Sequence, residues 1–149
     1  MTAKERAIAM LDRRDYSRRE LLKKLIEKGE DPAEAEAVVD RLAEIGFVND
    51  ERYSKLVVRH YAAKGYGPGR VRQELQRRGI EKELWDEAME QMPCQDDTID
   101  RLLRSRLRSG SPDRGEIKKA TDALARRGYG WDEIRSALER YNASIEEID

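Results

Sequence analysis

Two residue types that commonly carry catalysis occur once each in the 149-residue chain, as His60 and Cys94. A histidine can act as a general base, but His60 stands next to Tyr61 in a helical pattern, and we interpret it as a helix-surface or half-buried residue. A reactive thiol needs a basic neighbour, whereas Pro93 and Gln95 flank Cys94 in an expected linker. Neither residue therefore indicates a catalytic centre.

Motifs that bind phosphates, dinucleotides or metals are also absent from the sequence. There is no GxxxxGK[ST] loop, no GxGxxG following a strand and no cluster of histidine and cysteine. Carboxylates are abundant, but they recur as a solvated face and not as an isolated pair in an apolar pocket, which acid-base chemistry would need. We therefore predict a protein that is not an enzyme, with no catalytic residue, no cofactor and no metal.

The charged side chains suggest binding chemistry, because their sign alternates along the chain. Three segments are basic, with 8 basic and 4 acidic residues in 1–26, 6 and 1 in 59–79, and 9 and 3 in 101–127. Three others are acidic, with 2 basic and 9 acidic residues in 27–51, 1 and 8 in 81–100, and 2 and 6 in 132–149. Basic edges could contact nucleic-acid phosphates or the groove of a protein polymer. The alternative is that the charges only solvate small helical repeats.

The elements that would position these charges repeat along the chain. Segments LLKKLIEKG, VRQELQRRG and ATDALARRG end at Gly29, Gly79 and Gly128, at offsets of 50 and 49 residues. A leucine precedes each glycine by four residues, namely Leu25, Leu75 and Leu124. Apolar residues follow each glycine by nine, ten and thirteen positions: Val38, Val39 and Leu42 in the first repeat, Ala88, Met89 and Met92 in the second, and Ala137, Leu138 and Tyr141 in the third. One helical face thus recurs three times.

Local signals mark where these helices begin and end. Ser17 with Glu20 is a capping box, Pro32 and Pro68 fit first helical positions, and basic residues precede each repeat glycine. A further helix lies upstream in each repeat, with apolar faces Ala7, Ile8 and Leu11, then Val57, Val58 and Tyr61, then Leu103 and Leu107. A loop over 109–114 accounts for the longer third repeat.

These patterns predict an all-α fold of three tandem three-helix repeats, spanning residues 1–48, 49–93 and 94–149, in an elongated, curved array. No segment shows the alternation typical of strands. A single cysteine indicates a reducing cytoplasm. The charged N-terminus and the lack of 18 consecutive apolar residues predict a protein that is neither exported nor membrane-spanning.

The middle repeat contains the most distinctive turn, with the sequence KGYGP at residues 64–68. Gly65 and Gly67 bracket an aromatic residue and precede a proline, which predicts a tight turn between two helices. We expect Tyr66 to fill the gap between helices, with arginines displayed just beyond the turn. The alternative is that the segment is simply a well-made turn.

The segment KGYGPGRVRQELQRRGI resembles the characteristic motif of the RecX family, the regulators of the RecA recombinase. Two further segments resemble the family: MLDRRDYSRRELLKKLIEKG in the first repeat and RLAEIGFVNDERYSKLVV over 41–58. The resemblance is close over about 7–88 and weaker after Met92. It implies three-helix repeats, binding in the groove of the RecA filament on single-stranded DNA, and inhibition of strand exchange, ATP hydrolysis and filament growth.

From this resemblance we predict a monomeric negative regulator of recombination and DNA repair. Its partner is expected to be the RecA filament, and it is expected to bind DNA only weakly. The candidate contact residues are basic or aromatic: Lys64, Tyr66, Arg70, Arg72, Arg77, Arg78, Arg18 and Arg19. The turn is shaped by Gly65, Gly67, Pro68 and Gly79. Two alternatives stay open, a helical module that binds DNA directly and a scaffold that does not bind the filament.

Overall fold

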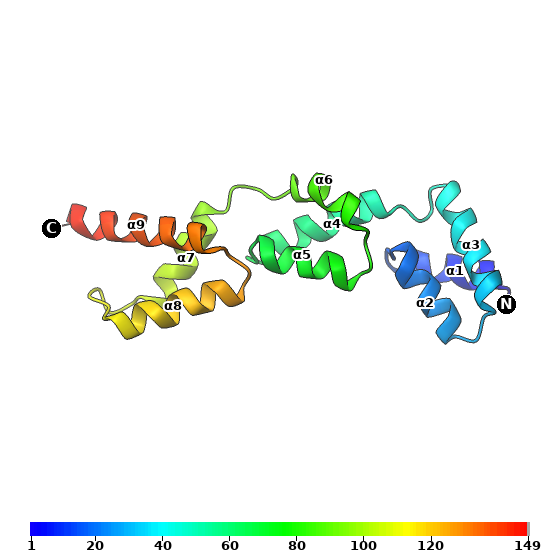
Figure 1. Cartoon of the computed structure of the whole chain (residues 1–149), viewed down its shortest axis with the longest axis horizontal. Coiled ribbons are helices and arrows are strands. Elements are labelled where there is room, and N and C mark those ends of the chain that lie inside the picture. The colour runs from blue at the N-terminus through cyan, green and yellow to red at the C-terminus, as the bar shows by residue number, and fades with distance from the viewer. Residues whose placement is uncertain (149) are drawn as a thin grey trace. The chain divides into compact units, whose positions relative to one another are not determined.

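The computed structural model describes the backbone of residues 1–148 and the side chains of residues 1–144. Within these residues the chain is helical and contains no strand (Figure 1). Its elements are α1 (Ala3–Arg13), α2 (Arg18–Glu27), α3 (Pro32–Glu44), α4 (Asp50–Ala63), α5 (Pro68–Arg77), η1 (Lys82–Leu84), α6 (Trp85–Met89), α7 (Asp96–Arg106), α8 (Arg114–Arg126) and α9 (Trp131–Ile148). The predicted all-α fold of tandem helical repeats is confirmed.

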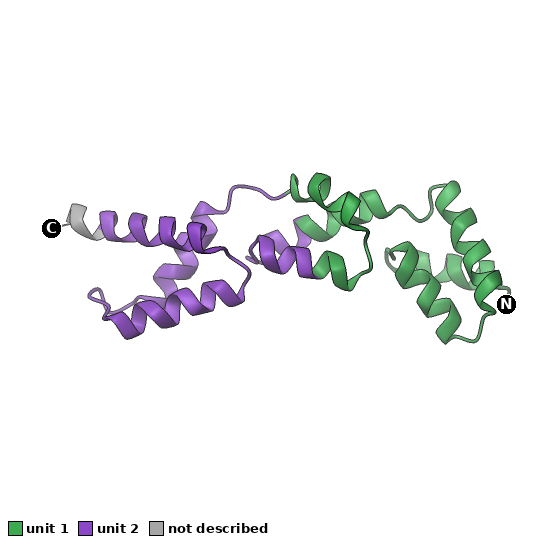
Figure 2. Cartoon of the chain, in the orientation of Figure 1, with its two compact units in different colours: residues 1–58, 74–91 green, residues 59–73, 92–149 purple. Residues whose placement is uncertain are grey.

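The helices form two compact units that do not coincide with the predicted repeats. Unit 1 contains residues 1–58 and 74–91, and unit 2 contains residues 59–73 and 92–149 (Figure 2). Helices α4 and α5 therefore contribute residues to both units. The repeat boundaries predicted from the sequence, and the elongated, curved array, stay predictions.

The first repeat, in unit 1, has its own apolar core. Side chains from α1, α2 and α3 meet there, with Ala7, Leu21, Leu25 and Leu42 fully buried. Both α1 and α2 begin with a capping box, in which Thr2 and Ser17 are the N-cap residues, so the predicted start of α2 is confirmed. Local capping and core packing thus agree in this repeat.

The third repeat, in unit 2, has a second core between α7, α8 and α9. Leu103, Leu124 and Ala137 are buried at its centre, as the repeat pattern predicts, and Leu107 closes it after the end of α7. Helix α7 ends at Arg106 and α8 begins at Arg114 after the N-cap Asp113, so the loop predicted over 109–114 is confirmed to within two residues.

One predicted helical face is wrong. The third helix of the middle repeat is a 3₁₀ turn followed by the short helix α6, which ends at Met89. Met92, predicted on the same face as Ala88 and Met89, lies beyond the helix. The reason is Pro93, because a proline has no N–H to donate and disfavours helical backbone in the residue before it.

Candidate partner-binding surface

The first residues of the KGYGP turn cap the C-terminus of α4. Gly65 adopts a positive φ of 88°, its N–H donates to the Ala62 carbonyl at 3.0 Å, and the Tyr66 N–H donates to the Tyr61 carbonyl at 3.1 Å. This is the Schellman arrangement, in which a glycine allows the last carbonyls of a helix to be satisfied. Pro68 then occupies the first position of α5, as predicted.

The same turn docks on the third repeat, in a contact within unit 2 that we call the second joint. The Gly67 N–H donates to the Arg127 carbonyl at 2.8 Å, and the Gly69 N–H donates to the Gly128 carbonyl at 2.9 Å. A Cβ atom on Gly67 would lie 2.6 Å from the Gly128 carbonyl carbon, and one on Gly128 would lie 2.3 Å from the Arg70 nitrogen. Both glycines are therefore required by close approach of two backbones.

Side chains of the third repeat complete the second joint. The Tyr129 hydroxyl donates to the Gly65 carbonyl at 2.9 Å, and Arg127 Nη2 donates to the Lys64 carbonyl at 3.0 Å. Burial raises the pKa of the Tyr129 hydroxyl above its ordinary value. The turn carbonyls are thus satisfied by residues about sixty positions away.

A related contact, the first joint, lies within unit 1 between the start of α2 and the end of α5. The Ser17 hydroxyl donates to the Arg78 carbonyl, and Ser17 is fully buried. The side chain of Arg19 covers Gly79, where an added Cβ would lie 2.5 Å from the Arg19 Cδ. Gly79 therefore has two roles, because its φ of 71° also ends α5.

Tyr66 is held inside the second joint. Its ring has the guanidinium of Arg70 at 4.8 Å and that of Arg127 at 5.0 Å from its centroid, and the Tyr61 ring at 5.9 Å. Its carbonyl accepts from Gln95 Nε2 at 2.8 Å. Tyr66 and Arg70 thus pack against each other and against the third repeat, consistent with the expectation that Tyr66 fills a gap between helices.

The remaining predicted arginines, on α5 and directly after its end, differ in exposure. Arg78 points inward and pairs with Glu74, whose side chain is only 2% exposed. Arg77 is 73% exposed and lies 3.4 Å from the same carboxylate. Arg72 is exposed and, among the described residues, has no ion-pair partner. Since Glu74 is buried, the outer face of α5 carries positive charge without a carboxylate.

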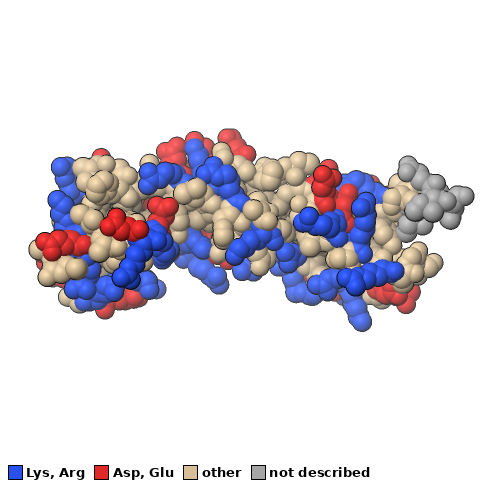
Figure 3. Space-filling view, turned by 180° about the vertical axis from the view of Figure 1, so that it is seen from behind, with Lys and Arg blue, Asp and Glu red and all other residues tan. Residues whose placement is uncertain are grey.

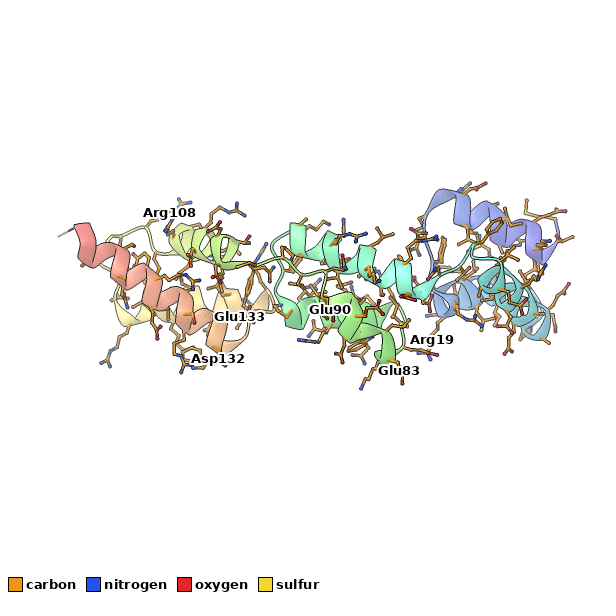
Figure 4. All side chains as sticks on the ribbon, turned by 90° about the horizontal axis from the view of Figure 1, so that it is seen from above. Arg19, Glu83, Glu90, Arg108, Asp132 and Glu133 are labelled. Atoms are coloured by element: carbon orange, nitrogen blue, oxygen red, sulfur yellow. The ribbon has the colours of Figure 1, made fainter. Side chains whose placement is uncertain are left out.

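The two predicted arginines of the first repeat serve mainly the fold of unit 1. The Arg18 guanidinium pairs with Asp40, and its backbone N–H donates to Asp50 Oδ1 at 2.9 Å. Burial raises the pKa of Asp50, with the Arg18 N–H opposing that shift. Arg19 is exposed at the rim of the first joint (Figure 4).

A shallow groove of about 360 Å³ runs over the second joint in unit 2. Arg70 and Arg72 from α5 line it, together with Arg126 from the end of α8 and Glu133 from α9. Arg126 was not predicted as a contact residue, although it belongs to the pair of basic residues before a repeat glycine. Asp132 and Glu133 mark the start of α9 beside this groove (Figure 4).

The two residues considered for catalysis are both exposed. His60 is on the surface of α4, with its ring edge-on to Tyr61 at 5.1 Å, and Cys94 is exposed between α6 and α7. The described side chains contain no group of three or more histidines, cysteines or carboxylates placed to hold a metal ion. Within residues 1–148, no helix combines the length and the apolar character required to cross a membrane.

Comparison with known proteins places this arrangement in a family. Models of the first and second three-helix domains of RecX match residues 3–42 and 49–89. A protein of Stenotrophomonas maltophilia named Regulatory protein RecX is 38% identical over 143 residues, which cover 95% of this chain and 87% of that protein. Another of that name, from Xanthomonas oryzae pv. oryzae, is 39% identical over 138 residues, covering 91% and 85%.

Solved structures share the fold at lower identity. The crystal structure of RecX from Lactobacillus salivarius superposes with a TM-score of 0.86 at 18% identity, covering 95% of each chain. A second crystal structure, of a regulatory protein RecX, gives a TM-score of 0.83 at 22% identity, covering 92% of this chain and 70% of the other. With both domain models matched and relatives 38% identical over more than four fifths of their length, this chain belongs to the RecX family of regulatory proteins.

Proposed function

We propose that the chain is a negative regulator of homologous recombination and DNA repair, which binds the groove of the RecA filament on single-stranded DNA and inhibits strand exchange and ATP hydrolysis. Membership of the RecX family supports a regulatory role. The observation that carries the proposed contact is the outer face of α5. In this reading no bond is made or broken by the protein itself.

The outer face of α5 is suited to contact a large, charged partner. Its exposed residues recur every three or four positions along one side of the helix and include two arginines and two glutamines: Gly69, Arg72, Gln73, Gln76 and Arg77. The other second helices also expose cations, among them Lys23 and Lys24 on α2 and Lys118, Lys119 and Arg126 on α8. Figure 3 shows lysine and arginine side chains spread over one face of the molecule. Several such charges steer association with a partner of opposite sign.

We assign different roles to the predicted contact residues. Arg72 and Arg77 would touch the filament, because their guanidinium groups are on the surface. Tyr66 and Arg70 would be positioning residues, since they pack within the second joint. Lys64 is exposed at the turn and could extend the contact. Arg18, Arg19 and Arg78 would hold the first joint and its surroundings.

The test is inhibition of the RecA ATPase on single-stranded DNA by the variant R72E/R77E. We expect about tenfold more of this variant to be needed for half-inhibition, because two surface charges of the contact are reversed. The matched control is R41E/R135E, which makes the same charge change on the exposed sides of α3 and α9 and should inhibit like the unmodified chain. Equal inhibition by both folded variants would remove the outer face of α5 from the mechanism.

Co-sedimentation separates the proposal from direct DNA binding. We expect the chain to pellet with RecA filaments and to bind bare single-stranded DNA weakly, since its net charge is −1. Tight binding to bare DNA that falls steeply with added salt would instead favour the DNA-binding module. Failure to pellet with either would favour a scaffold with another partner.

We further propose that the protein acts in the cytoplasm as a monomer. In both joints the preceding repeat packs against a repeat glycine, Gly79 or Gly128. The residue after that glycine is hydrophobic and buried, namely Ile80 or Tyr129. The corresponding residue of the first repeat is Glu30, which is paired with Arg6 at 3.0 Å. A charged, paired residue at this position disfavours docking of a second chain by the same type of joint. Sedimentation equilibrium should therefore report the mass of one chain.

A further inference from the structure

A second groove, in the first repeat, is not used by the proposed filament contact. It lies in unit 1 between α1 and α2 and has a volume of about 360 Å³. Its apolar lining consists of Met1, Ala9 and Met10, with Met10 nearly buried at 8% exposure. The groove therefore offers a small apolar surface that solvent can reach.

The charged residues that line this groove are all cationic. Its charged residues are Arg6, Arg13, Lys24 and Lys28. Arg6 is neutralised by Glu30 at 3.0 Å, and Lys24 lies 3.9 Å from Glu27. Among the described side chains, Arg13 and Lys28 have no carboxylate within ion-pair distance. Two positive charges are thus left uncompensated beside an apolar surface.

Other grooves of the molecule differ in this respect. The groove over the second joint contains Glu133, and the two grooves around Gly79 contain Glu81. A small cavity between α7 and α9 contains Asp100. Each of them already holds an internal carboxylate, whereas the groove between α1 and α2 has none in its lining.

We propose that the groove between α1 and α2 binds an acidic protein segment, with a carboxylate between Arg13 and Lys28 and one leucine-sized side chain against Met10 and Ala9. Charge complementarity selects the acidic partner, and burial of an apolar side chain adds affinity that charge alone does not provide. This inference rests on Arg13, Lys28 and Met10, none of which is used in the proposed RecA contact.

A nucleic acid fits this groove less well than a peptide. Proteins that bind single strands without sequence preference stack bases on open aromatic faces. The one aromatic residue in the lining is Tyr16, and the Arg14 guanidinium covers its ring at 3.8 Å from the centroid. The rest of the uncharged lining is aliphatic or thioether, which matches an apolar side chain.

The test is fluorescence anisotropy of the full chain with a fluorescein-labelled peptide containing three repeats of Glu-Glu-Leu-Glu. We expect saturable binding that the variant R13Q/K28Q weakens by about tenfold, since both uncompensated charges are lost. The control K4Q/K23Q removes two exposed cations from the same two helices outside the groove, and should weaken binding by less than about twofold. Far-UV circular dichroism verifies that both variants are folded.

Two further probes separate the sources of affinity. The same peptide with serine in place of leucine should bind about fivefold more weakly, because the apolar contact is lost. A fluorescein-labelled twelve-nucleotide oligothymidine should bind more weakly than the leucine peptide. The proposal is overturned if the leucine peptide does not bind, if both double variants weaken it equally, or if the oligonucleotide binds more tightly through Arg13 and Lys28.

Discussion

In the first joint side chains at the start of α2 contact the backbone at the end of α5, whereas in the second joint the two backbones also contact each other directly. Ser17 reaches the Arg78 carbonyl with its hydroxyl, and the methylenes of Arg19 cover Gly79. In the second joint the N–H groups of Gly67 and Gly69 reach carbonyls of the next repeat directly. A side-chain contact can adjust to substitution, but two backbones in contact leave no room for a Cβ atom. This difference explains why the glycine-rich turn lies in the middle repeat.

The largest effect is expected from Gly128→Ala, which adds a Cβ 2.3 Å from the Arg70 nitrogen. Gly29 is a matched control, because its φ of 97° is nearly that of Gly128 at 98°, while an added Cβ at Gly29 has nothing within 4 Å. We expect urea denaturation to show a loss of about 3 kcal/mol or more for Gly128→Ala and about 1–2 kcal/mol for Gly29→Ala. Equal losses would mean that backbone conformation alone requires Gly128.

A smaller loss is expected from Ser17→Ala in the first joint. This change removes both the N-cap of α2 and the bond to the Arg78 carbonyl, for about 2 kcal/mol. Thr2→Ala provides the comparison, because Thr2 closes the same type of capping box on α1 but is exposed. It should cost about 1 kcal/mol in the same urea denaturation. If Thr2→Ala costs as much as Ser17→Ala, the bond across the first joint contributes nothing.

Tyr129→Phe should destabilise the chain by about 1 kcal/mol, because the Gly65 carbonyl keeps only its bond from Arg127 Nε at 3.3 Å. Burial raises the pKa of Tyr129 above 10.0, so the hydroxyl stabilises the fold fully below that pH and less as pH rises through the folded pKa. Denaturation at about pH 8 and pH 11 should therefore differ less for the variant than for the unmodified chain.

The pH dependence should not vanish in Tyr129→Phe, because burial also raises the pKa of Tyr53 in unit 1. If the free energy of unfolding changes between the two pH values as much in the variant as in the unmodified chain, Tyr129 does not ionise on unfolding. That result would contradict its burial in the second joint.

The smallest effect is expected from Asp50→Asn beside the first joint. Burial raises the pKa of Asp50 above 3.8, so the ionised carboxylate costs stability at neutral pH, and this cost is relieved as pH falls through the folded pKa. Asparagine keeps the oxygen that accepts the Arg18 N–H, so stability at pH 7 should stay equal or rise by less than about 1 kcal/mol. Thermal unfolding measures this, and a clear loss at neutral pH would show that the negative charge is needed.

The helices can be predicted from the sequence because the signals that begin and end them are local. The capping box at Ser17, the proline at the start of α5 and the glycines that end the second helices all act within one helical turn. Met92 lies outside the predicted helical face because the proline that follows it overrides the apolar spacing. The cause there is also local and could have been read from the sequence.

The joints could not be predicted from local signals, because their partners are about sixty residues apart. One weak signal was nevertheless present. Twelve residues before the repeat glycines stand Ser17, Gly67 and Glu116, so the position is small in the two repeats that dock on a following one. No such signal shows that the side chains of Glu74 and Arg78 point inward, because an acidic and a basic residue four positions apart are also typical of an exposed helix face.

The most direct test of the second joint is hydrogen exchange of the Gly67 and Gly69 amides, followed by NMR at neutral pH. Both N–H groups donate to carbonyls of the third repeat, so they should exchange at least about a hundredfold more slowly than in an unfolded chain. Protection should be lost in folded Gly128→Ala and kept in Gly29→Ala. Unprotected Gly67 and Gly69 amides in the folded, unmodified chain would contradict the docking of the turn on the third repeat.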